Sequence, residues 1–310
     1  MRSAAAQSDP LLSEGHRRCA QITRRYGTTY YWGTLLLPPE RRRHVYAVYT
    51  LCRLADDIVD DEGATTPAHV ATTATRLHEL AATFRRVTDG EPTDDPVLAA
   101  IGHSVRACGI ADECFERFFG AMARDLTTTT YETWDDLLGY MDGSAAVIGE
   151  MMLPVLQPRS TRALEPARAL GLAFQLTNFL RDVGEDLGRG RVYVPQADLR
   201  RFGADPAARR VTPEWRELMR FEVERNRALY READAGIPLL PSASARCVST
   251  ARTLYARILD RIEARDYDVF TDRARVPTWH KAALSARVFV LGPFQPARSV
   301  QSANSREVTP

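Results

Sequence analysis

The sequence predicts an all-α protein with one folded domain over residues 16–292. Apolar residues recur there at i, i+3, i+4 and i+7, with glycine or proline between the runs. No sustained alternation of apolar and polar residues predicts a strand, and no shift in composition marks a linker. Residues 1–15 and 293–310 lack this periodicity, so we expect both tails to be disordered.

The first well-defined helix should begin at Pro38-Pro39 and end at Gly63. The same periodicity predicts further helices over residues 71–88, 96–108, 111–126, 134–156, 166–187, 213–235, 243–265 and 278–291. Two acidic pairs, Asp94-Asp95 and Asp135-Asp136, fall at predicted helix starts, where carboxylates cap helices and interact favourably with the helix dipole.

Composition excludes several classes of protein. The formal net charge of +1 excludes a general binder of nucleic acid, and the 45% hydrophobic content fits an ordinary globular chain. Five cysteines without a CxxC pair predict neither disulfides nor zinc, so a reducing cytoplasm fits best. No run of 18 apolar residues is present, so any membrane contact would be peripheral. Forty of the 41 basic residues are arginine, which indicates either a coding bias or a need for bidentate phosphate contacts.

The stretch RLADDIVDD, residues 53–61, places carboxylates on the buried stripe of its helix. At about 100° per residue, Asp56 lies within roughly 40° of Val45, Tyr49 and Cys52, and Asp60 follows one turn later. Like charges at this spacing repel, and desolvating them without partners costs far more. The sequence therefore predicts a cation between the two carboxylates.

A second acidic cluster lies in QLTNFLRDVGEDLGRGRVYVP, residues 175–195. One face of this predicted helix carries Gln175, Asn178, Asp182 and Asp186, and the opposite face is apolar. A polar face usually points to water, and that alternative stays open for this segment. If the two clusters face each other across a cavity, however, they form a cage of oxygen ligands.

Oxygen ligands without nearby histidine or cysteine select Mg²⁺ or Mn²⁺ rather than zinc. Magnesium commonly bridges carboxylates to substrate phosphates, so the pattern predicts a phosphorylated ligand. Arg53 and Arg181 flank the clusters and could hold diphosphate oxygens, although surface salt bridges would explain them equally well. The chain contains no Walker or dinucleotide-binding loop, no GxSxG elbow and no HExxH motif.

These features together resemble the isoprenoid synthases, and the finer motifs resemble the squalene/phytoene synthase family. YAVYTLCRLADDIVD is similar to the family's first aspartate motif and NFLRDVGEDLGRGRVYVP to its second. The resemblance runs from about residue 24 to Lys281. It implies a helical bundle around a central cavity, and a prenyltransferase that joins two prenyl diphosphates head to head through a cyclopropylcarbinyl diphosphate. The implied product is phytoene, made from two geranylgeranyl diphosphates during carotenoid biosynthesis.

The resemblance also implies roles for individual residues. It gives Asp56, Asp60, Asp182 and Asp186 as Mg²⁺ ligands, with Mn²⁺ a possible substitute and with Asn178 and Gln175 beside them. It places diphosphates on Arg53, Arg181 and Arg273. Tyr140 and Tyr255 match family tyrosines whose ring faces would stabilise allylic cations.

Two segments depart from the family pattern. Where the family has HSKSF or HSKTF, this chain has YGTTYY, with Gly27 and Thr28 in place of the serine and lysine. Where the family has YCxxVAGxVG, this chain reads YMDGSAAVIGE, with Ala146 in place of a glycine. The first departure removes a diphosphate-binding lysine, and the second affects the helix break after Tyr140.

Other functions remain open at this point. Squalene or dehydrosqualene formation from farnesyl diphosphate would use the same motifs. Terpene cyclisation or head-to-tail elongation would need one allylic substrate, and the long second motif disfavours both. An inactive paralogue that binds metal is the non-catalytic alternative. A water-insoluble hydrocarbon product would favour a cytoplasmic protein that contacts the membrane peripherally.

Overall fold

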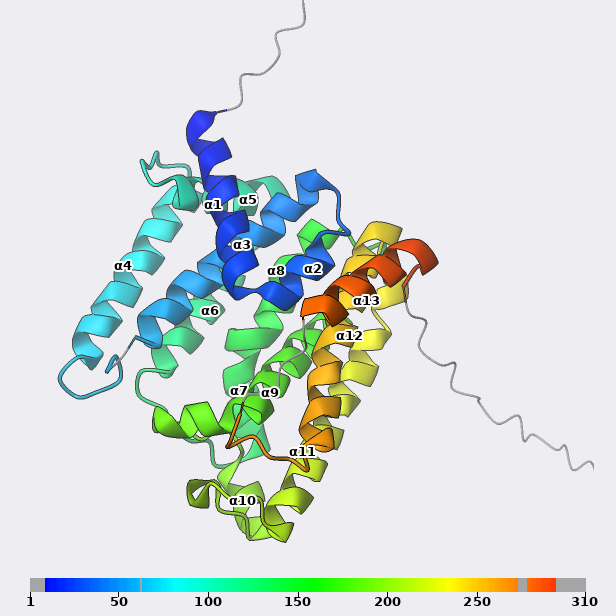
Figure 1. Cartoon of the computed structure of the whole chain (residues 1–310). Helices are drawn as coiled ribbons and strands as arrows, with labels where there is room; N and C mark the ends of the chain where they lie inside the picture. The colour runs from blue at the N-terminus through cyan, green and yellow to red at the C-terminus, as the bar shows by residue number, and fades with distance from the viewer. Residues whose placement is uncertain (1–8, 62, 273–277, 294–310) are drawn as a thin grey trace, which may run out of the picture.

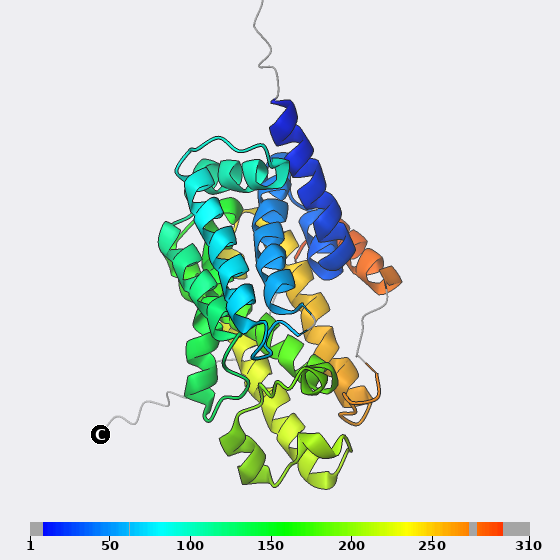
Figure 2. The ribbon, with the colours of Figure 1, turned by 90° about the vertical axis from the view of Figure 1, so that its left-hand side faces the viewer.

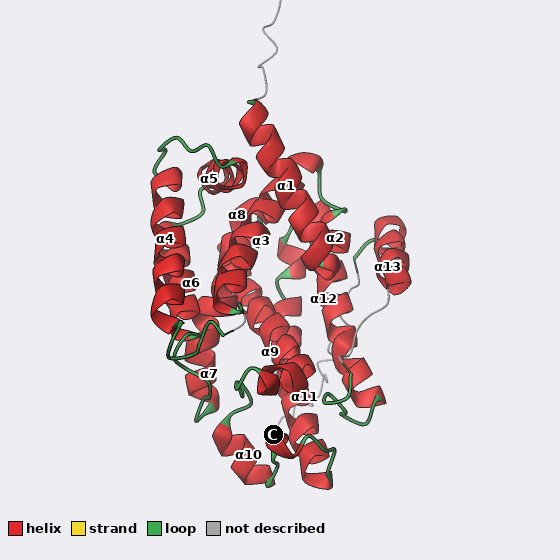
Figure 3. Cartoon of the chain, turned by 60° about the vertical axis from the view of Figure 1, so that its left-hand side comes forward, coloured by secondary structure: helices red, strands yellow, loops and turns green. Residues whose placement is uncertain are grey.

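The computed structural model describes residues 9–61, 63–272 and 278–293, and this part of the chain is helical with no β-strand (Figure 3). The first half of the chain forms the helices α1 (Pro10–Tyr26), α2 (Thr28–Thr34), α3 (Pro39–Val59), α4 (Val70–Thr88), α5 (Pro96–Cys108), α6 (Asp112–Arg124), α7 (Trp134–Met141) and α8 (Val147–Leu156). The second half forms α9 (Leu164–Gly188), α10 (Gln196–Phe202), α11 (Pro213–Asp234), α12 (Ser242–Ala264) and α13 (Thr278–Leu291).

The helices form one bundle in which α9 is central (Figure 1). Helix α9 packs against α8, α11 and α12, and α8 also packs against α3. Helices α4 to α6 lie on one side of the bundle and α12 and α13 on the other, as Figure 2 shows from cyan and green to orange. Among the residues described, no helix combines the length and the apolar content that crossing a bilayer requires.

Most predicted helices are confirmed, including the capping roles of two aspartates. Asp95 accepts hydrogen bonds from the backbone N–H groups of Val97 and Leu98 at the start of α5. Asp136 and Thr133 form a reciprocal capping box at the start of α7. Local polar chemistry at these two helix starts was therefore readable from the sequence.

The prediction of a disordered tail over residues 1–15 is wrong for residues 10–15. Helix α1 begins at Pro10, because Asp9 accepts a hydrogen bond from Leu11 N–H at 2.9 Å and proline is favourable in the first helical position. Packing of α1 against α3 and α5 then holds this turn in place. Residues 1–8 and 294–310 lie outside the described part of the chain.

Two helix boundaries also differ from the prediction. Helix α3 ends at Val59, before Gly63, so Asp60 is its C-cap residue rather than part of its last turn. The predicted single helix over residues 134–156 is interrupted by a π-helical turn, Asp142–Ala146, between α7 and α8. Helix α10 had no counterpart in the sequence prediction, because its seven residues are too few to show a helical period.

Candidate active site

A cavity of about 1080 Å³ lies inside the bundle, between α3 and α9. Its lining along α9 changes from apolar to mostly polar, in the order Pro166, Ala167, Leu170, Gly171, Phe174, Gln175, Asn178, Phe179, Arg181, Asp182, Glu185 and Asp186. Along α3 the lining changes in the same direction, in the order Val45, Tyr49, Cys52, Arg53, Asp56 and Val59, with Asp60 just beyond the helix. Arg191, just beyond α9, hydrogen-bonds to Asp60 at the end of α3, so the polar ends of the two helices meet. The cavity therefore has a polar end and an apolar end.

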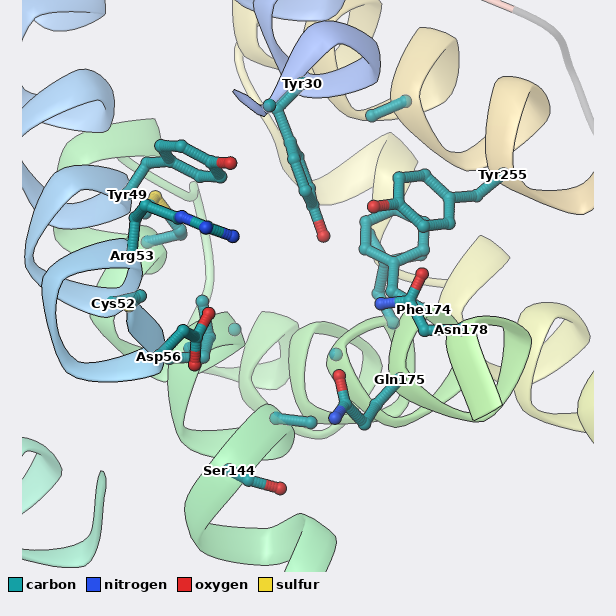
Figure 4. A pocket seen from close by; sticks show the side chains of 18 of the residues that line it. Tyr30, Tyr49, Cys52, Arg53, Asp56, Ser144, Phe174, Gln175, Asn178 and Tyr255 are labelled. Atoms are coloured by element: carbon teal, nitrogen blue, oxygen red, sulfur yellow. The ribbon is translucent and has the colours of Figure 1, made fainter. Parts of the chain in front are cut away.

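The acids of α3 differ in their surroundings. Asp60 accepts hydrogen bonds from Arg191 Nη1 at 2.7 Å and Arg189 Nη1 at 3.5 Å. Asp56 faces the cavity (Figure 4), and burial together with the charge of Asp60 raises its pKa to about 7. The prediction for the buried stripe of α3 is therefore confirmed for Asp56 and wrong for Asp60, which lies beyond the end of the helix and is exposed.

The acids of α9 repeat this arrangement. Asp182 accepts hydrogen bonds from the guanidinium of its neighbour Arg181, at 2.7 Å from Nε and 2.5 Å from Nη2. Asp186 is only 9% exposed, and burial together with the charge of Asp182 raises its pKa to about 7. The alternative that this polar face simply points to water is therefore wrong, since the face lines the cavity.

The side-chain atoms at the polar end that could bind a metal ion are all oxygens. Gln175 and Asn178 extend from α9 toward the cavity (Figure 4), and Asn178 Oδ1 is buried without a hydrogen-bond partner. Within the described residues, no three acidic, histidine or cysteine side chains converge on one point that could hold a metal ion. The carboxylates instead form two separate pairs. The raised pKa values of Asp56 and Asp186 and the unsatisfied amide oxygen of Asn178 fit a hard cation whose remaining ligands come from a phosphorylated substrate.

Several cationic side chains line the same end. Arg53 forms an ion pair with Asp57 and lies over the ring of Tyr26, with 4.6 Å between its Cζ and the ring centroid. Lys281, the single lysine in the chain, donates a 2.7 Å hydrogen bond to Thr28 Oγ1. Lys281 therefore lines the cavity beside a residue of the segment that lacks the family's lysine. Arg273 lies outside the described residues.

Aromatic rings form a wall between the two ends. Tyr255 packs on Phe174 with ring centroids 4.3 Å apart, and Tyr30 lies 5.3 Å from Tyr255 (Figure 4). The hydroxyl of Tyr30 extends into the cavity, and burial raises its pKa well above the ordinary tyrosine value. Both predicted tyrosines, Tyr140 and Tyr255, line the cavity. Tyr30 was missed because the family motif carries phenylalanine there.

The π-helical turn shapes the wall next to Tyr140. Two arginines, Arg117 and Arg168, clamp Asp142 at its start and Glu150 in α8. Gly171 allows α9 to approach this turn, because a Cβ atom there would lie 2.2 Å from a backbone oxygen of the turn. The turn therefore forms although Ala146 replaces the family's glycine. It places Ser144 in the cavity lining (Figure 4), with its Oγ buried and without a hydrogen-bond partner.

Two further cavity residues were missing from the sequence prediction. Asp125, just after α6, accepts a 2.7 Å hydrogen bond from the hydroxyl of Tyr140. Arg191 is 5% exposed and joins the end of α9 to Asp60. Asp125 lies in the short run RDL, which belongs to no acidic cluster, so its sequence offered no signal. Arg191 lies inside the second motif, and only the fold shows that it contacts the first.

The fold is a helical bundle in which two acidic helix ends line one end of a central cavity, as in the class of helical synthases that the sequence resembles. Residues 23–280 match the squalene/phytoene synthase family, and the chain belongs to this family of prenyltransferases. The chain is 40% identical to the chloroplastic phytoene synthase of Daucus carota, over 88% of this chain and 69% of that protein. It is 37% identical to the 15-cis-phytoene synthase of Synechococcus elongatus, over 87% of this chain and 91% of that protein.

A solved structure shares the fold. The crystal structure of a dehydrosqualene synthase in complex with ligand superposes with a TM-score of 0.81 at 26% sequence identity. The superposition covers 90% of this chain and 97% of that one. The predicted family and the predicted helical bundle around a central cavity are therefore confirmed.

Proposed function

We propose that this chain condenses two geranylgeranyl diphosphates head to head into phytoene, through a cyclopropylcarbinyl diphosphate and with Mg²⁺. The observation that carries the proposal is the polarity of the cavity, whose acidic helix ends meet at one end while its other end is apolar. Its volume of about 1080 Å³ lies at the upper end of small-molecule pockets, which are typically about 300–1,000 Å³. Such a cavity suits two long hydrocarbon chains with charged heads on the same side.

The proposed metal ligands are the oxygens of Asp56, Asp60, Asn178, Asp182 and Asp186. Bound Mg²⁺, or Mn²⁺ in its place, would neutralise the diphosphate charge as that group leaves. Gln175 lies beside these ligands and orients the substrate head group. The chain's own part at this end is to hold two diphosphates apart, one near each acidic helix.

Cationic side chains complete the proposed diphosphate sites. Arg53 and Arg181 bind phosphate oxygens by exchanging their present carboxylate partners for substrate. Arg273 is proposed for the same role on the family motif alone. Lys281 adds a compact charge beside Thr28 and compensates for the lysine missing from YGTTYY.

The aromatic wall would stabilise the allylic cations formed when diphosphate leaves. The faces of Tyr255 and Tyr140 attract cationic carbon through the ring quadrupole, and burial keeps water away from it. Tyr140 is 2% exposed and Tyr255 is 7% exposed. We propose both as residues of the reaction chamber, with Tyr140 as the catalytic one.

The experiment that tests this function measures diphosphate release and hydrocarbon product from purified protein. We expect phytoene from geranylgeranyl diphosphate, no turnover in excess EDTA, and recovery with Mg²⁺ or Mn²⁺ but not with Zn²⁺. Full activity in EDTA would contradict the metal role. Absence of diphosphate release under all conditions would favour the inactive paralogue.

Dehydrosqualene or squalene formation from farnesyl diphosphate is the second candidate. The similarity to the dehydrosqualene synthase structure favours it, because both reactions use the same fold. Parallel assays with farnesyl and geranylgeranyl diphosphate separate the two. A higher kcat/KM for farnesyl diphosphate would move the assignment to the shorter substrate and leave the proposed metal chemistry in place.

We also propose a cytoplasmic enzyme in peripheral contact with a membrane. The product is a hydrocarbon without aqueous solubility, so its release into lipid would limit steady-state turnover. Detergent micelles or lipid vesicles should then raise the steady-state rate without changing the first turnover. An unchanged rate would count against release as the slow step.

A further inference from the structure

Asp125 occupies a position that ordinary folding preferences disfavour. It follows the last residue of α6, where a carboxylate opposes the helix dipole, and it is only 5% exposed. Its Oδ1 atom is buried without a hydrogen-bond partner among the residues described. Burying a carboxylate there costs folding free energy, and such costs concentrate at functional sites. Asp125 also lines the cavity, which places this carboxylate next to the reacting groups.

The partner of Asp125 is the hydroxyl of Tyr140. The 2.7 Å hydrogen bond runs from Tyr140 Oη to Asp125 Oδ2, and both residues are buried. Because the phenolic hydrogen points to Asp125, the lone pairs of the phenolic oxygen are left for a group in the cavity. Stacking of Tyr140 against Tyr131 and Tyr193, at centroid distances of 5.1 and 6.2 Å, fixes its ring.

The charges around Asp125 come from three segments of the chain. They are Arg124 at the end of α6, Arg191 beyond α9, and Asp56 and Asp60 at the end of α3, with the hydroxyls of Tyr140, Tyr131 and Tyr193 beside them. Burial raises the pKa of Asp125 to about 6, while the Tyr140 hydrogen bond and the Arg191 charge oppose this rise. A carboxylate in this range is ionised at neutral pH and can still accept a proton during a reaction.

This inference rests on the proposed function and adds a route for the proton. We propose that Asp125 is a positioning residue that draws the proton off the substrate through Tyr140. Each half of a head-to-head condensation releases one diphosphate and one proton from carbon. The Tyr140 oxygen takes that proton while the hydroxyl proton passes to Asp125 Oδ2. The electron pair of the C–H bond closes the cyclopropane in the first half and forms the carbon–carbon double bond in the second. The proton leaves Asp125 to solvent before the next turnover.

The decisive variant is Asp125→Asn, which keeps the size of the side chain and an acceptor oxygen for the Tyr140 hydroxyl but cannot take the proton. We expect kcat to fall about 10²–10³-fold, with KM within about threefold of wild type. Asp125→Glu restores a carboxylate, so its kcat should be at least about tenfold higher than that of Asp125→Asn. Asp112→Asn is the matched control, because Asp112 is an exposed acid at the other end of α6 and its variant should match wild type.

A second variant keeps the test independent of how Asp125→Asn folds. Tyr140→Phe removes the relay from the other side, so Tyr140→Phe and the double variant with Asp125→Asn should have the same kcat. Circular dichroism confirms that each variant is folded.

Three results would overturn the relay. A kcat for Asp125→Asn within threefold of wild type would leave the departing diphosphate as the proton acceptor. A raised KM and a lower melting temperature in Asp125→Asn, without recovery of kcat in Asp125→Glu, would make Asp125 structural only. A double variant slower than Tyr140→Phe alone would show that Asp125 acts outside the relay. Wild-type assays on both prenyl diphosphates come first, because absence of product there contradicts the proposed function rather than the relay.

Discussion

The two acidic helix ends look alike in sequence but are built differently. Among the residues that the structure describes, one carboxylate of each pair forms an ion pair with arginine and the other does not. Asp182 takes its partner, Arg181, from the adjacent position on its own helix. Asp60 lies outside α3 and takes Arg191 from a segment 131 positions further along the chain. The ion pair of Asp182 with Arg181 is therefore local, whereas that of Asp60 with Arg191 depends on the tertiary fold.

The conformation of the first acidic motif, residues 53–61, therefore depends on Arg191 of the second motif. Arg191 also donates a hydrogen bond to the backbone oxygen of Val59, so it binds both the C-terminal turn of α3 and its cap residue. A change at the end of α9 should therefore disturb the acids of α3, whereas the reverse should be weaker.

The largest expected effect on turnover comes from Asp56 and Asp186, which have no arginine ion pair among the described residues. Asp56→Asn and Asp186→Asn should each lower kcat by at least about 10³-fold, because each removes a proposed metal ligand worth several kcal/mol of transition-state stabilisation. Their melting temperatures should stay the same or rise, since a buried charge has been removed. Steady-state kinetics and thermal unfolding without metal measure both. A large loss of stability in either variant would show that these carboxylates hold the fold.

Asp60 and Asp182, the acids with arginine partners, should differ in how much their loss lowers the free energy of unfolding. Asp60→Ala and Asp182→Ala should both abolish turnover. Asp60→Ala should also cost about 1–3 kcal/mol of unfolding free energy, because the buried guanidinium of Arg191 loses its main partner. Asp182→Ala should cost less, since Arg181 can turn toward Tyr255 and Glu185, which already influence it. Denaturant unfolding of the two variants checks this order, and equal costs would remove the proposed difference.

Much of the fold and part of the site could be predicted from the sequence. The helical periodicity and the capping residues predicted most of the helices. The position of Asp56 on the buried stripe of α3 predicted where the site lies. The contacts of Arg191 with Asp60 and of Lys281 with Thr28 join segments far apart in the chain, so no local pattern reports them. The π-helical turn is held by Arg117 and Arg168 from two other helices, which likewise leaves no periodic signal.

The apolar end should decide substrate length with a smaller effect. Thr34 is 3% exposed, lines the cavity and hydrogen-bonds to Tyr46 of α3. Five more buried carbons would contribute up to ~4 kcal/mol at about 0.8 kcal/mol each, and incomplete fit makes a preference of about tenfold for the longer diphosphate more realistic. Thr34→Phe should fill this space and shift kcat/KM toward farnesyl diphosphate. The comparison of both substrates in wild type and variant tests it, and an unchanged ratio would place the length limit elsewhere.

A pH change acts on a third region and sets the conditions for the stability comparison. His16, His44 and His103 lie with ring centroids 5.5–6.0 Å apart, and burial lowers the pKa of His16 and of His44 to about 4. Since unfolded histidine titrates near 6.5, these two residues stabilise the fold above that pH and lose this contribution as the pH falls toward 4. The buried acids with raised pKa values change the stability in the opposite direction as the pH falls. Only a comparison of wild type with a histidine variant therefore isolates the contribution of the histidines.

The measurement is the melting temperature of wild type and of a His16→Asn/His44→Asn variant between pH 7 and 4.5. Wild type should lose more stability than the variant, by about 2–4 °C for each kcal/mol. Parallel curves would show that the cluster does not titrate. Stability comparisons of the aspartate variants therefore belong above pH 6.5.

The smallest expected effect is at Asp61, which follows Asp60 beyond the end of α3. Its carboxylate forms an ion pair with Arg76 at 3.2 Å, and both side chains are about half exposed. Exposed pairs contribute roughly 0.2–1 kcal/mol, so Asp61→Ala should keep kcat within about twofold and stability within about 1 kcal/mol. Because Asp60 is a cap residue and not helical, its direction is set by Arg191 rather than by helix periodicity. If Asp61→Ala lowered kcat as much as Asp60→Ala does, the wrong one of these two neighbours would have been assigned to the cavity. The contact of Asp60 with Arg191, which distinguishes the acids near α3 from those of α9, would then have no functional consequence.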